Sequence, residues 1–304
     1  MKHARILTCI LLFALSCLLC VGIAAENGGF APGSTDVFYV SNTSGADANE
    51  GTSAAAPLKT LGKAYSKMTK GGTLVICGEV TIPSAFTPVD AGGMVIFTSV
   101  YGGKDYRDSG ARLNVGGNMG FANATGFERM NLRITVGGLV FSGRHHSLYF
   151  GSDLKVTNGT GSSDFTYPTL VGGYNNPSTL SDASSTADYT LCIRSGTWHS
   201  VFGGNRRGNS TSAFGKLSGD VTVRISGGTF NGTVSASGMN VHTGRLYLGT
   251  ADTPVFKDTV CGYYRYGTMP AASLRTTAKY SGGVMVRLAG GTFKSGFRLG
   301  MSRV

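Results

Sequence analysis

A short motif of seven residues returns along this chain at nearly regular intervals. Its three clear copies occupy Cys192–Trp198, Arg224–Phe230 and Arg287–Phe293, and each ends in a glycine, a threonine and an aromatic residue. The threonines of successive copies are 32 and 63 residues apart, which is close to one and two periods, and a weaker copy spans Thr135–Phe141. Self-similarity at a fixed period is the sequence signature of stacked structural units. We therefore expect the chain to fold by adding one unit onto the last.

The composition indicates that these units are made of strands. Glycine supplies 47 of the 304 residues, and charged residues make up only 14% of the chain. Short β-branched and aromatic runs alternate with glycine-rich turns, a pattern typical of an all-β fold with many short strands.

Stacking places equivalent side chains over one another. We expect Trp198, Phe230 and Phe293 to form an aromatic ladder in the interior. Arg224 and Arg287, which open two of the copies, alternate with apolar residues and are expected to face outward.

One segment near the start of the chain reads as a helix. Pro57 suits a first helical position, and the glycines at 71 and 72 suit a helix end. We expect a helix over about residues 57–69, with one apolar stripe: Leu58, Leu61, Tyr65 and Met68. A stripe this narrow does not stabilise a lone helix in water, so the helix must pack on an apolar surface.

The sequence FYVSNTSGADANEGTSAAAPLKTLGKAYSKMTKGGTLVICGEVTI, Phe38–Ile82, resembles the opening of right-handed parallel β-helix proteins of the pectate-lyase-like group. The resemblance implies a right-handed parallel β-helix, a solenoid, over residues 36–304. It also implies that the short helix caps the N-terminal end of that solenoid and that the protein is exported.

The first 25 residues have the features of a secretory signal peptide. Lys2 and Arg5 precede an apolar run that ends in small residues near Ala25. The alternative is an uncleaved membrane anchor, but Thr8 and Ser16 interrupt the run, so we favour cleavage near Ala25. We expect a disordered leader over 26–35, no membrane span after cleavage, and a protein that is secreted or held at the cell surface.

The mature chain is basic and is not a disulfide scaffold. It keeps 25 of the 27 Lys and Arg residues against 16 Asp and Glu, a net charge of about +9. Its three cysteines, Cys77, Cys192 and Cys261, lie far apart in apolar runs, so we expect buried free thiols. No spacing typical of metal ligands is present, and we predict no metal site.

The last residues follow directly on a copy of the motif. An open solenoid end is an aggregation hazard. We therefore expect the sequence to be a fragment, or its C-terminal end to be covered by further repeats or by an oligomeric partner.

Arg144, His145 and His146 form the densest cluster of reactive side chains in the sequence. One interpretation is proton transfer or binding of a sugar acid, with the two histidines on opposite sides of an extended segment. The interpretation that we favour is a basic, solvated turn between two strands. His199 is a further candidate, although the equivalent position varies between copies of the motif.

Other candidate binding residues are basic or aromatic. Arg206 and Arg207 follow a glycine pair, and Tyr264 and Arg265 lie in a tyrosine-rich run. Together with Arg144, Arg224, Arg245 and Arg287, these arginines could form a positive strip that attracts an acidic polysaccharide, and the tyrosine could stack on a sugar. Evenly spread solubility charge is the alternative.

The expected function is glycan binding or adhesion, with a polysaccharide or surface glycan as the partner. An alternative is a polysaccharide lyase or hydrolase acting on acidic polysaccharides, and calcium would be a cofactor only in the lyase case. A third is a structural stalk segment of a larger surface protein. The carboxylates are scattered rather than paired, so we lean against an enzyme. An exported chain without a recognisable nucleic-acid module argues against nucleic acid.

Overall fold

The computed structural model describes residues 30–206, 217–237, 244–248, 254–258, 260–265, 285–288, 291–295 and 297–302, with side chains left out at 244–248, 262–265, 285–288 and 297–302. All the elements given below belong to one compact unit, Pro32–Val304.

Most described strands fall into four parallel sheets. Sheet I consists of β1 (Val37–Val40), β2 (Gly72–Ile76), β4 (Val95–Thr98), β9 (Thr125–Glu128), β12 (Leu148–Phe150), β15 (Tyr189–Ile193), β18 (Val221–Ile225), β21 (Gly244–Leu248) and β24 (Met285–Leu288). Sheet II consists of β8 (Met119–Gly120), β11 (Val140–Ser142), β14 (Thr169–Val171), β17 (Val201–Phe202), β20 (Val234–Ser235), β23 (Val260–Arg265) and β26 (Phe297–Ser302).

The two remaining parallel sheets are smaller. Sheet III consists of β3 (Glu79–Ile82), β7 (Arg112–Val115), β10 (Met130–Ile134) and β13 (Leu154–Asn158). Sheet IV consists of β16 (Thr197–Trp198), β19 (Thr229–Phe230), β22 (Val255–Phe256) and β25 (Thr292–Phe293). An antiparallel pair, β5 (Val100–Tyr101) and β6 (Lys104–Asp105), precedes a short 3-10 helix, η1 (Arg107–Ser109).

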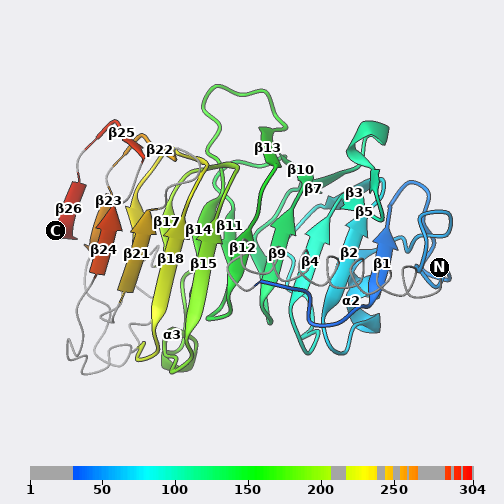
Figure 1. Cartoon of the computed structure of the whole chain (residues 1–304), viewed down its shortest axis with the longest axis horizontal. Helices are drawn as coiled ribbons and strands as arrows, with labels where there is room; N and C mark the ends of the chain where they lie inside the picture. The colour runs from blue at the N-terminus through cyan, green and yellow to red at the C-terminus, as the bar shows by residue number, and fades with distance from the viewer. Residues whose placement is uncertain are drawn as a thin grey trace, which may run out of the picture. The chain divides into compact units, whose positions relative to one another are not determined.

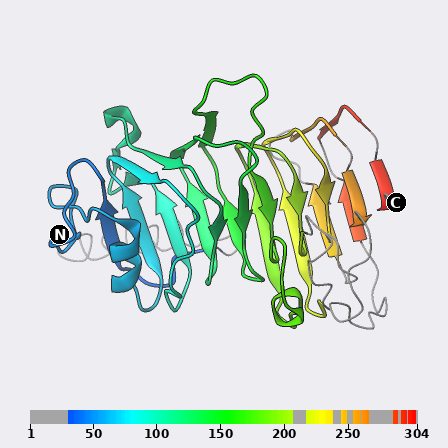
Figure 2. The same cartoon turned by 180° about the vertical axis from the view of Figure 1, so that it is seen from behind.

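The chain visits these sheets in a fixed order. From β7 onward each pass of the chain runs through sheet III or IV, then sheet II, then sheet I. Apart from β8 and β16, which begin sheets II and IV, each new strand pairs in parallel with the strand from the pass before. The strands of sheet I therefore lie side by side in chain order from β1 to β24 (Figure 1), and the view from behind shows the same progression along the chain (Figure 2). The prediction of an all-β fold is confirmed for the described residues.

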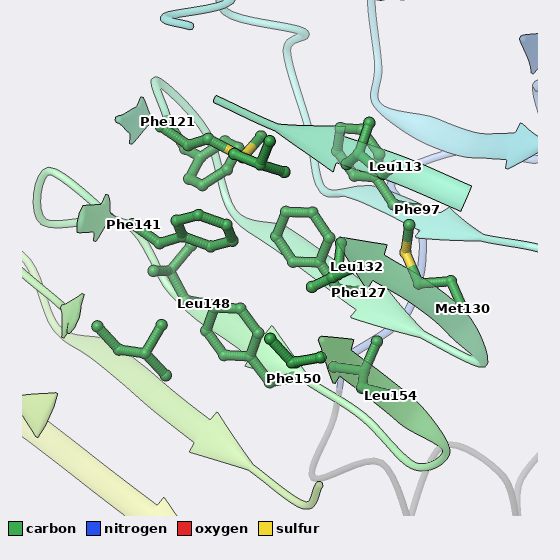
Figure 3. Close-up of a cluster of buried hydrophobic side chains, with 14 of the residues drawn as sticks. Phe97, Leu113, Phe121, Phe127, Met130, Leu132, Phe141, Leu148, Phe150 and Leu154 are labelled. Carbon is green, nitrogen blue, oxygen red and sulfur yellow. The ribbon is translucent and has the colours of Figure 1, made fainter. Parts of the chain in front are cut away.

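The core is a stack of apolar rows, one residue from each pass. Phe97, Phe127 and Phe150 occupy equivalent positions in β4, β9 and β12. The ring centroid of Phe127 lies 4.8 Å from that of Phe97 and 5.5 Å from that of Phe150, with the rings nearly parallel (Figure 3). All three rings are fully buried. The ladder register therefore imposes ring stacking on the core.

The repeated motif aligns as predicted. Trp198 pairs with Phe230, and Phe293 occupies the same row of sheet IV two strands further along. Between them lies Phe256, which the sequence analysis missed and whose ring stacks at 5.2 Å on Phe230 and 5.0 Å on Phe293. The aromatic ladder is confirmed. Arg224 is exposed as expected, and the side chain of Arg287 lies outside the described structure.

The weaker copy of the motif was wrongly aligned. Its residues Thr135–Phe141 follow β10 of sheet III and run into β11 of sheet II, whereas the clear copies join sheet I to sheet IV. The shared glycine pair marks a turn at both places, but the turn lies at a different corner.

The helix begins later than predicted. It spans α2 (Leu61–Lys67) rather than 57–69, because Thr60 is its N-cap and accepts a hydrogen bond from the N–H of Lys63 at 3.2 Å. The carboxylate of Asp47 accepts two further bonds at 2.9 Å, from the N–H and the hydroxyl of Thr60. Leu58 instead forms a parallel bridge with Val40.

The burial of the predicted apolar stripe is confirmed, although Leu58 precedes α2 and Met68 is its C-cap. All four of its predicted side chains are buried. The Tyr65 ring lies 6.1 Å from the ring of Phe97 and 5.9 Å from that of Phe86. The helix therefore packs against the same aromatic row that runs through sheet I.

The described segment ahead of β1 contacts the sheets. The N–H of Gly33 donates to Met94 O at 2.8 Å, and the hydroxyl of Ser34 donates to Gly71 O at 3.0 Å. Both residues lie in the predicted leader over 26–35, so the domain includes contacts ahead of the predicted start at residue 36. The predicted signal peptide over 1–25 lies outside the described residues.

Cys77, Cys192 and Cys261 are free thiols, as expected, but only Cys192 and Cys261 are buried, whereas Cys77 is half-buried. Burial raises the pKa of the Cys192 and Cys261 thiols to about 11, which leaves them protonated and unreactive. Within the described ranges, no helix combines the length and apolar character needed to cross a bilayer.

Replacing the central ring of the stack tests the importance of the ladder. Phe127→Ala removes a buried ring that stacks on both neighbours and should lower the free energy of unfolding by about 3–5 kcal/mol in urea denaturation. The control Val136→Ala, at a side chain that is 49% exposed, should change it by less than about 0.5 kcal/mol. Equal effects of the two substitutions would contradict the stacked core.

Candidate functional site

A cleft of about 180 Å³ opens beside the first strands of sheet II. Four successive passes of the chain contribute to it. The segment around Phe86 forms a parallel bridge with Met119 of β8, β8 pairs with β11, and β11 pairs with β14. Its lining combines hydroxyls, amides, one guanidinium and one tyrosine: Ala85, Thr87, Asn118, Met119, Gly120, Val140, Ser142, Arg144, Tyr174 and Asn175.

Arg144 projects into this cleft from the turn that follows β11. Its guanidinium carbon lies 5.5 Å from the centroid of the Tyr174 ring, and its Nη2 donates to the hydroxyl of Thr87 at 3.3 Å. Gly120 leaves room for the side chain, because a Cβ there would lie 2.7 Å from Nε of Arg144. The arginine therefore lines the cleft with its charge over an aromatic ring.

The backbone of this turn is unusual. Arg144 and His145 have positive φ angles of 49° and 69°, a left-handed conformation that few residues other than glycine adopt. The N–H groups of both residues donate to the next pass, at 3.1 Å to Gly173 O and 3.0 Å to Gly172 O. These two bonds hold the turn against the end of β14.

His145 does not behave as predicted. The segment is a turn rather than an extended stretch, and His145 is buried, with 9% of its surface exposed. Its Nε2 lies 2.9 Å from Oδ1 of Asn205. Burial lowers the pKa of His145, although the bond to Asn205 acts in the opposite direction. The predicted turn between two strands is confirmed, and His146 is exposed on it. His145 is not solvated as expected, and the two histidines do not lie on opposite sides of an extended segment.

Asn205 joins three parts of the chain beneath the cleft. Its Oδ1 accepts from the N–H of Tyr174 at 2.8 Å as well as facing His145, and its Nδ2 donates to Ala183 O at 2.7 Å. Ala183 ends the short helix α3 (Leu180–Ala183). Gly173 makes room for this amide, because a Cβ there would lie 2.1 Å from Oδ1.

Of the other predicted binding residues, one lies beside the cleft and two do not line it. Arg206 donates from Nη1 to Oδ1 of Asn175 at 3.1 Å, so it lies beside the cleft. His146 is exposed on the same turn as Arg144 but does not line the cleft. His199 lies half-buried in the turn between β16 and β17, and burial, assisted by the charge of Arg206, lowers its pKa.

Three predicted residues fall partly or wholly outside the described structure. Arg207 lies outside the described residues. Tyr264 and Arg265 belong to β23, but their side chains lie outside the described part.

Acidic groups are scarce at this site. The described residues that line the cleft include no aspartate or glutamate. In the part of the chain that the structure describes, no three His, Cys, Asp or Glu side chains gather as ligands for a metal ion.

Sequence reasoning found Arg144 but missed Tyr174, Asn175 and Asn205. A second repeat could have identified them. Val171–Asn175 reads VGGYN and Phe202–Arg206 reads FGGNR, and the two segments stack on each other in sheet II.

Comparison of the chain with protein-family models, with curated proteins and with solved structures found no match.

The space left by Gly173 gives a test of this arrangement. Gly173→Ala would place a methyl group onto the Asn205 amide, and we expect the free energy of unfolding to fall by about 1–3 kcal/mol. The control is Gly62→Ala in α2, where nothing lies within 4 Å of the added Cβ. There we expect a gain of about 0.5–1 kcal/mol, because alanine favours a helix interior. Chemical denaturation of both variants makes the comparison, and a harmless Gly173→Ala would contradict the packing described.

Proposed function

We propose that residues 36–304 form a right-handed parallel β-helix, with α2 as the cap of its first turn. The order in which the chain visits the sheets supports a solenoid, as do the parallel ladders and the aromatic rows. The buried stripe of α2 against Phe97 supports the cap. Right-handedness follows from the strong preference of parallel crossover connections.

We also propose that the protein is exported and binds an acidic glycan in the cleft around Arg144. The observation that carries the proposal is the guanidinium of Arg144, which lies in an open cleft beside an aromatic ring. Among the described residues, no carboxylate forms an ion pair with it. Guanidinium groups bind carboxylates in bidentate fashion, and a tyrosine offers a face to a sugar ring.

The remaining lining offers donors to the rest of a sugar. The Nδ2 groups of Asn118 and Asn175 and the hydroxyl of Thr87 line the cleft, while the Oδ1 atoms of the two amides already accept bonds from Val140 N–H and Arg206. Arg206, bonded to Asn175, extends the positive charge along the same side. A polymer lying over the ends of successive strands could contact both arginines.

The alternative functions need different features. A polysaccharide lyase or hydrolase needs carboxylates near the bond to be cleaved, often with calcium in a lyase, and the described lining offers none. A structural stalk needs no ligand at all. The cleft with its arginine favours binding over both.

Charge removal in the cleft tests the binding function. The purified chain from Glu26 onward is passed over immobilised polygalacturonate and, separately, alginate. Arg144→Gln should weaken retention by about tenfold, the effect of losing one charge-assisted hydrogen bond, and wild-type retention should fall with added salt. Lys155→Gln is the matched control, since Lys155 is an exposed cation of β13 in sheet III.

The same samples separate the alternatives. Formation of unsaturated sugar products that stops when calcium is removed would overturn the binding function in favour of a lyase. If the protein neither binds nor cleaves the polysaccharides, the structural stalk would be the remaining function. Equal losses for Arg144→Gln and Lys155→Gln would indicate general charge attraction without a specific site.

Export has its own test. We expect the protein recovered from outside an expressing bacterial cell to begin at Glu26, since small residues at Ala24 and Ala25 suit signal peptidase. N-terminal sequencing measures the start directly. Recovery of the chain with its first residues intact in the membrane fraction would support the anchor instead.

A further inference from the structure

The Asn205 side chain is the most connected polar group beneath the cleft. It is 1% exposed, and its side chain makes hydrogen bonds to three separate segments. These are the turn after β11, the end of β14 and the end of α3. An amide buried this deeply holds its partners in fixed positions, because leaving them unpaired would cost free energy.

The contacts of Asn205 also fix the protonation of His145. The N–H of Tyr174 donates to Oδ1, and Nδ2 donates to the carbonyl of Ala183, so the oxygen and nitrogen of the amide are assigned independently of the histidine. Since Oδ1 can only accept, Nε2 of His145 must carry the hydrogen. Nδ1 is then the atom that takes up a proton in acid.

The surroundings of His145 disfavour the protonated, charged form of its ring. The imidazole packs between aromatic rings, 5.2 Å from Tyr174 and 5.7 Å from Tyr189 between centroids. Two cationic or titratable neighbours, Arg144 and His146, lie on its own turn, while the half-buried carboxylate of Asp182 approaches from α3. Burial outweighs the carboxylate and lowers the pKa of His145 below its ordinary value of 6.5.

We propose that Asn205 and His145 are positioning residues for the cleft, and that protonation of His145 at Nδ1 in mild acid loosens the arrangement of Arg144 and Tyr174. The Nε2–H bond to Asn205 survives this protonation, so the loosening comes from placing a charge on a ring that is only 9% exposed. Arg144 directly precedes His145, and Tyr174 donates its N–H to the amide that His145 contacts. The positions of Arg144 and Tyr174 therefore both depend on the buried pair of His145 and Asn205. Release of a glycan in acid rests on the function proposed above. The acid sensitivity of the contacts that His145 and Tyr174 make with Asn205 does not rest on it.

The sign of the effect follows from the direction of the pKa shift. A histidine whose pKa is lower in the folded protein favours the folded arrangement above pH 6.5, its ordinary value. That contribution is lost as the pH falls from 6.5 toward the lowered value. The contacts among His145, Asn205 and Tyr174 should therefore be intact near neutral pH and weaken in mild acid.

The first readout needs no ligand. The protection factor of the Tyr174 amide, measured by hydrogen exchange and corrected for intrinsic rates, reports the bond from its N–H to Asn205. In the wild-type chain we expect this factor to fall about tenfold between about pH 7.5 and pH 5. His145→Gln keeps a neutral donor for Oδ1 and should abolish the pH dependence, whereas His146→Gln, on the exposed neighbour, should leave it unchanged.

The second readout is retention on immobilised polygalacturonate across the same pH range. Wild type and His146→Gln should lose retention in acid, and His145→Gln should keep it. Asn205→Ala should weaken retention at every pH, while Asn175→Ala, which removes a lining amide, should weaken it without changing its pH dependence.

The outcomes separate the two proposals. Unchanged Tyr174 protection in acid, or the same acid response in His145→Gln as in wild type, would overturn the positioning role. A fall in protection without retention of polymer at any pH would overturn the proposed glycan binding and support the acid-sensitive arrangement alone. If His145→Gln fails to fold, a histidine titration by NMR replaces it. The His145 signal must then titrate below pH 6.5, together with the loss of Tyr174 protection.

Discussion

The register between neighbouring parallel strands is the constraint on which the rest of the structure depends. Each pass of the chain places its residues directly over those of the pass before. An apolar residue at the equivalent position of each pass therefore builds a continuous core. Phenyl rings at equivalent positions then stack with nearly parallel planes. Helix α2 continues this pattern, because Tyr65 packs against the first ring of the row. Local packing and overall topology therefore support each other.

The same register builds the cleft. At the ends of β11, β14 and β17 the stacked residues are small, and Gly203 approaches the backbone of Ala236 too closely for any side chain. This narrow corner lets the chain turn back toward sheet I. One residue further along, Gly173 leaves the space that Asn205 fills. A steric requirement of the fold therefore creates the buried support beneath Arg144.

Much of the fold could be predicted from the sequence, because stacked units repeat their pattern of residues. The motif copies identified the row of sheet IV, although Val255–Phe256 lacks the glycines and was missed. The burial of the apolar stripe was predicted correctly, but the start of the helix was not, because the N-cap Thr60 is held by the carboxylate of Asp47, which lies 13 residues earlier in a loop.

The site was harder to predict than the fold. Arg144 stood out by its charge, but its neighbours come from other passes of the chain. His145 was expected in solvent, and its burial depends on Tyr189 and Asn205, which are distant in sequence. Contacts between passes that carry no repeated residue type leave no periodic signal, so sequence patterns do not reveal them.

Construction from stacked strands also fixes the scale on which such a site can change. Neighbouring strands lie about 4.8 Å apart, so Arg144 and Arg206, which follow strands two positions apart in sheet II, are offset by about 10 Å along the stack. Duplication or loss of a whole pass would move these two groups by one full step while leaving each local turn intact. Spacing between binding groups can therefore evolve only in steps of one strand. A ligand with a regular repeat of its own would be accepted or rejected according to whether its period matches those steps.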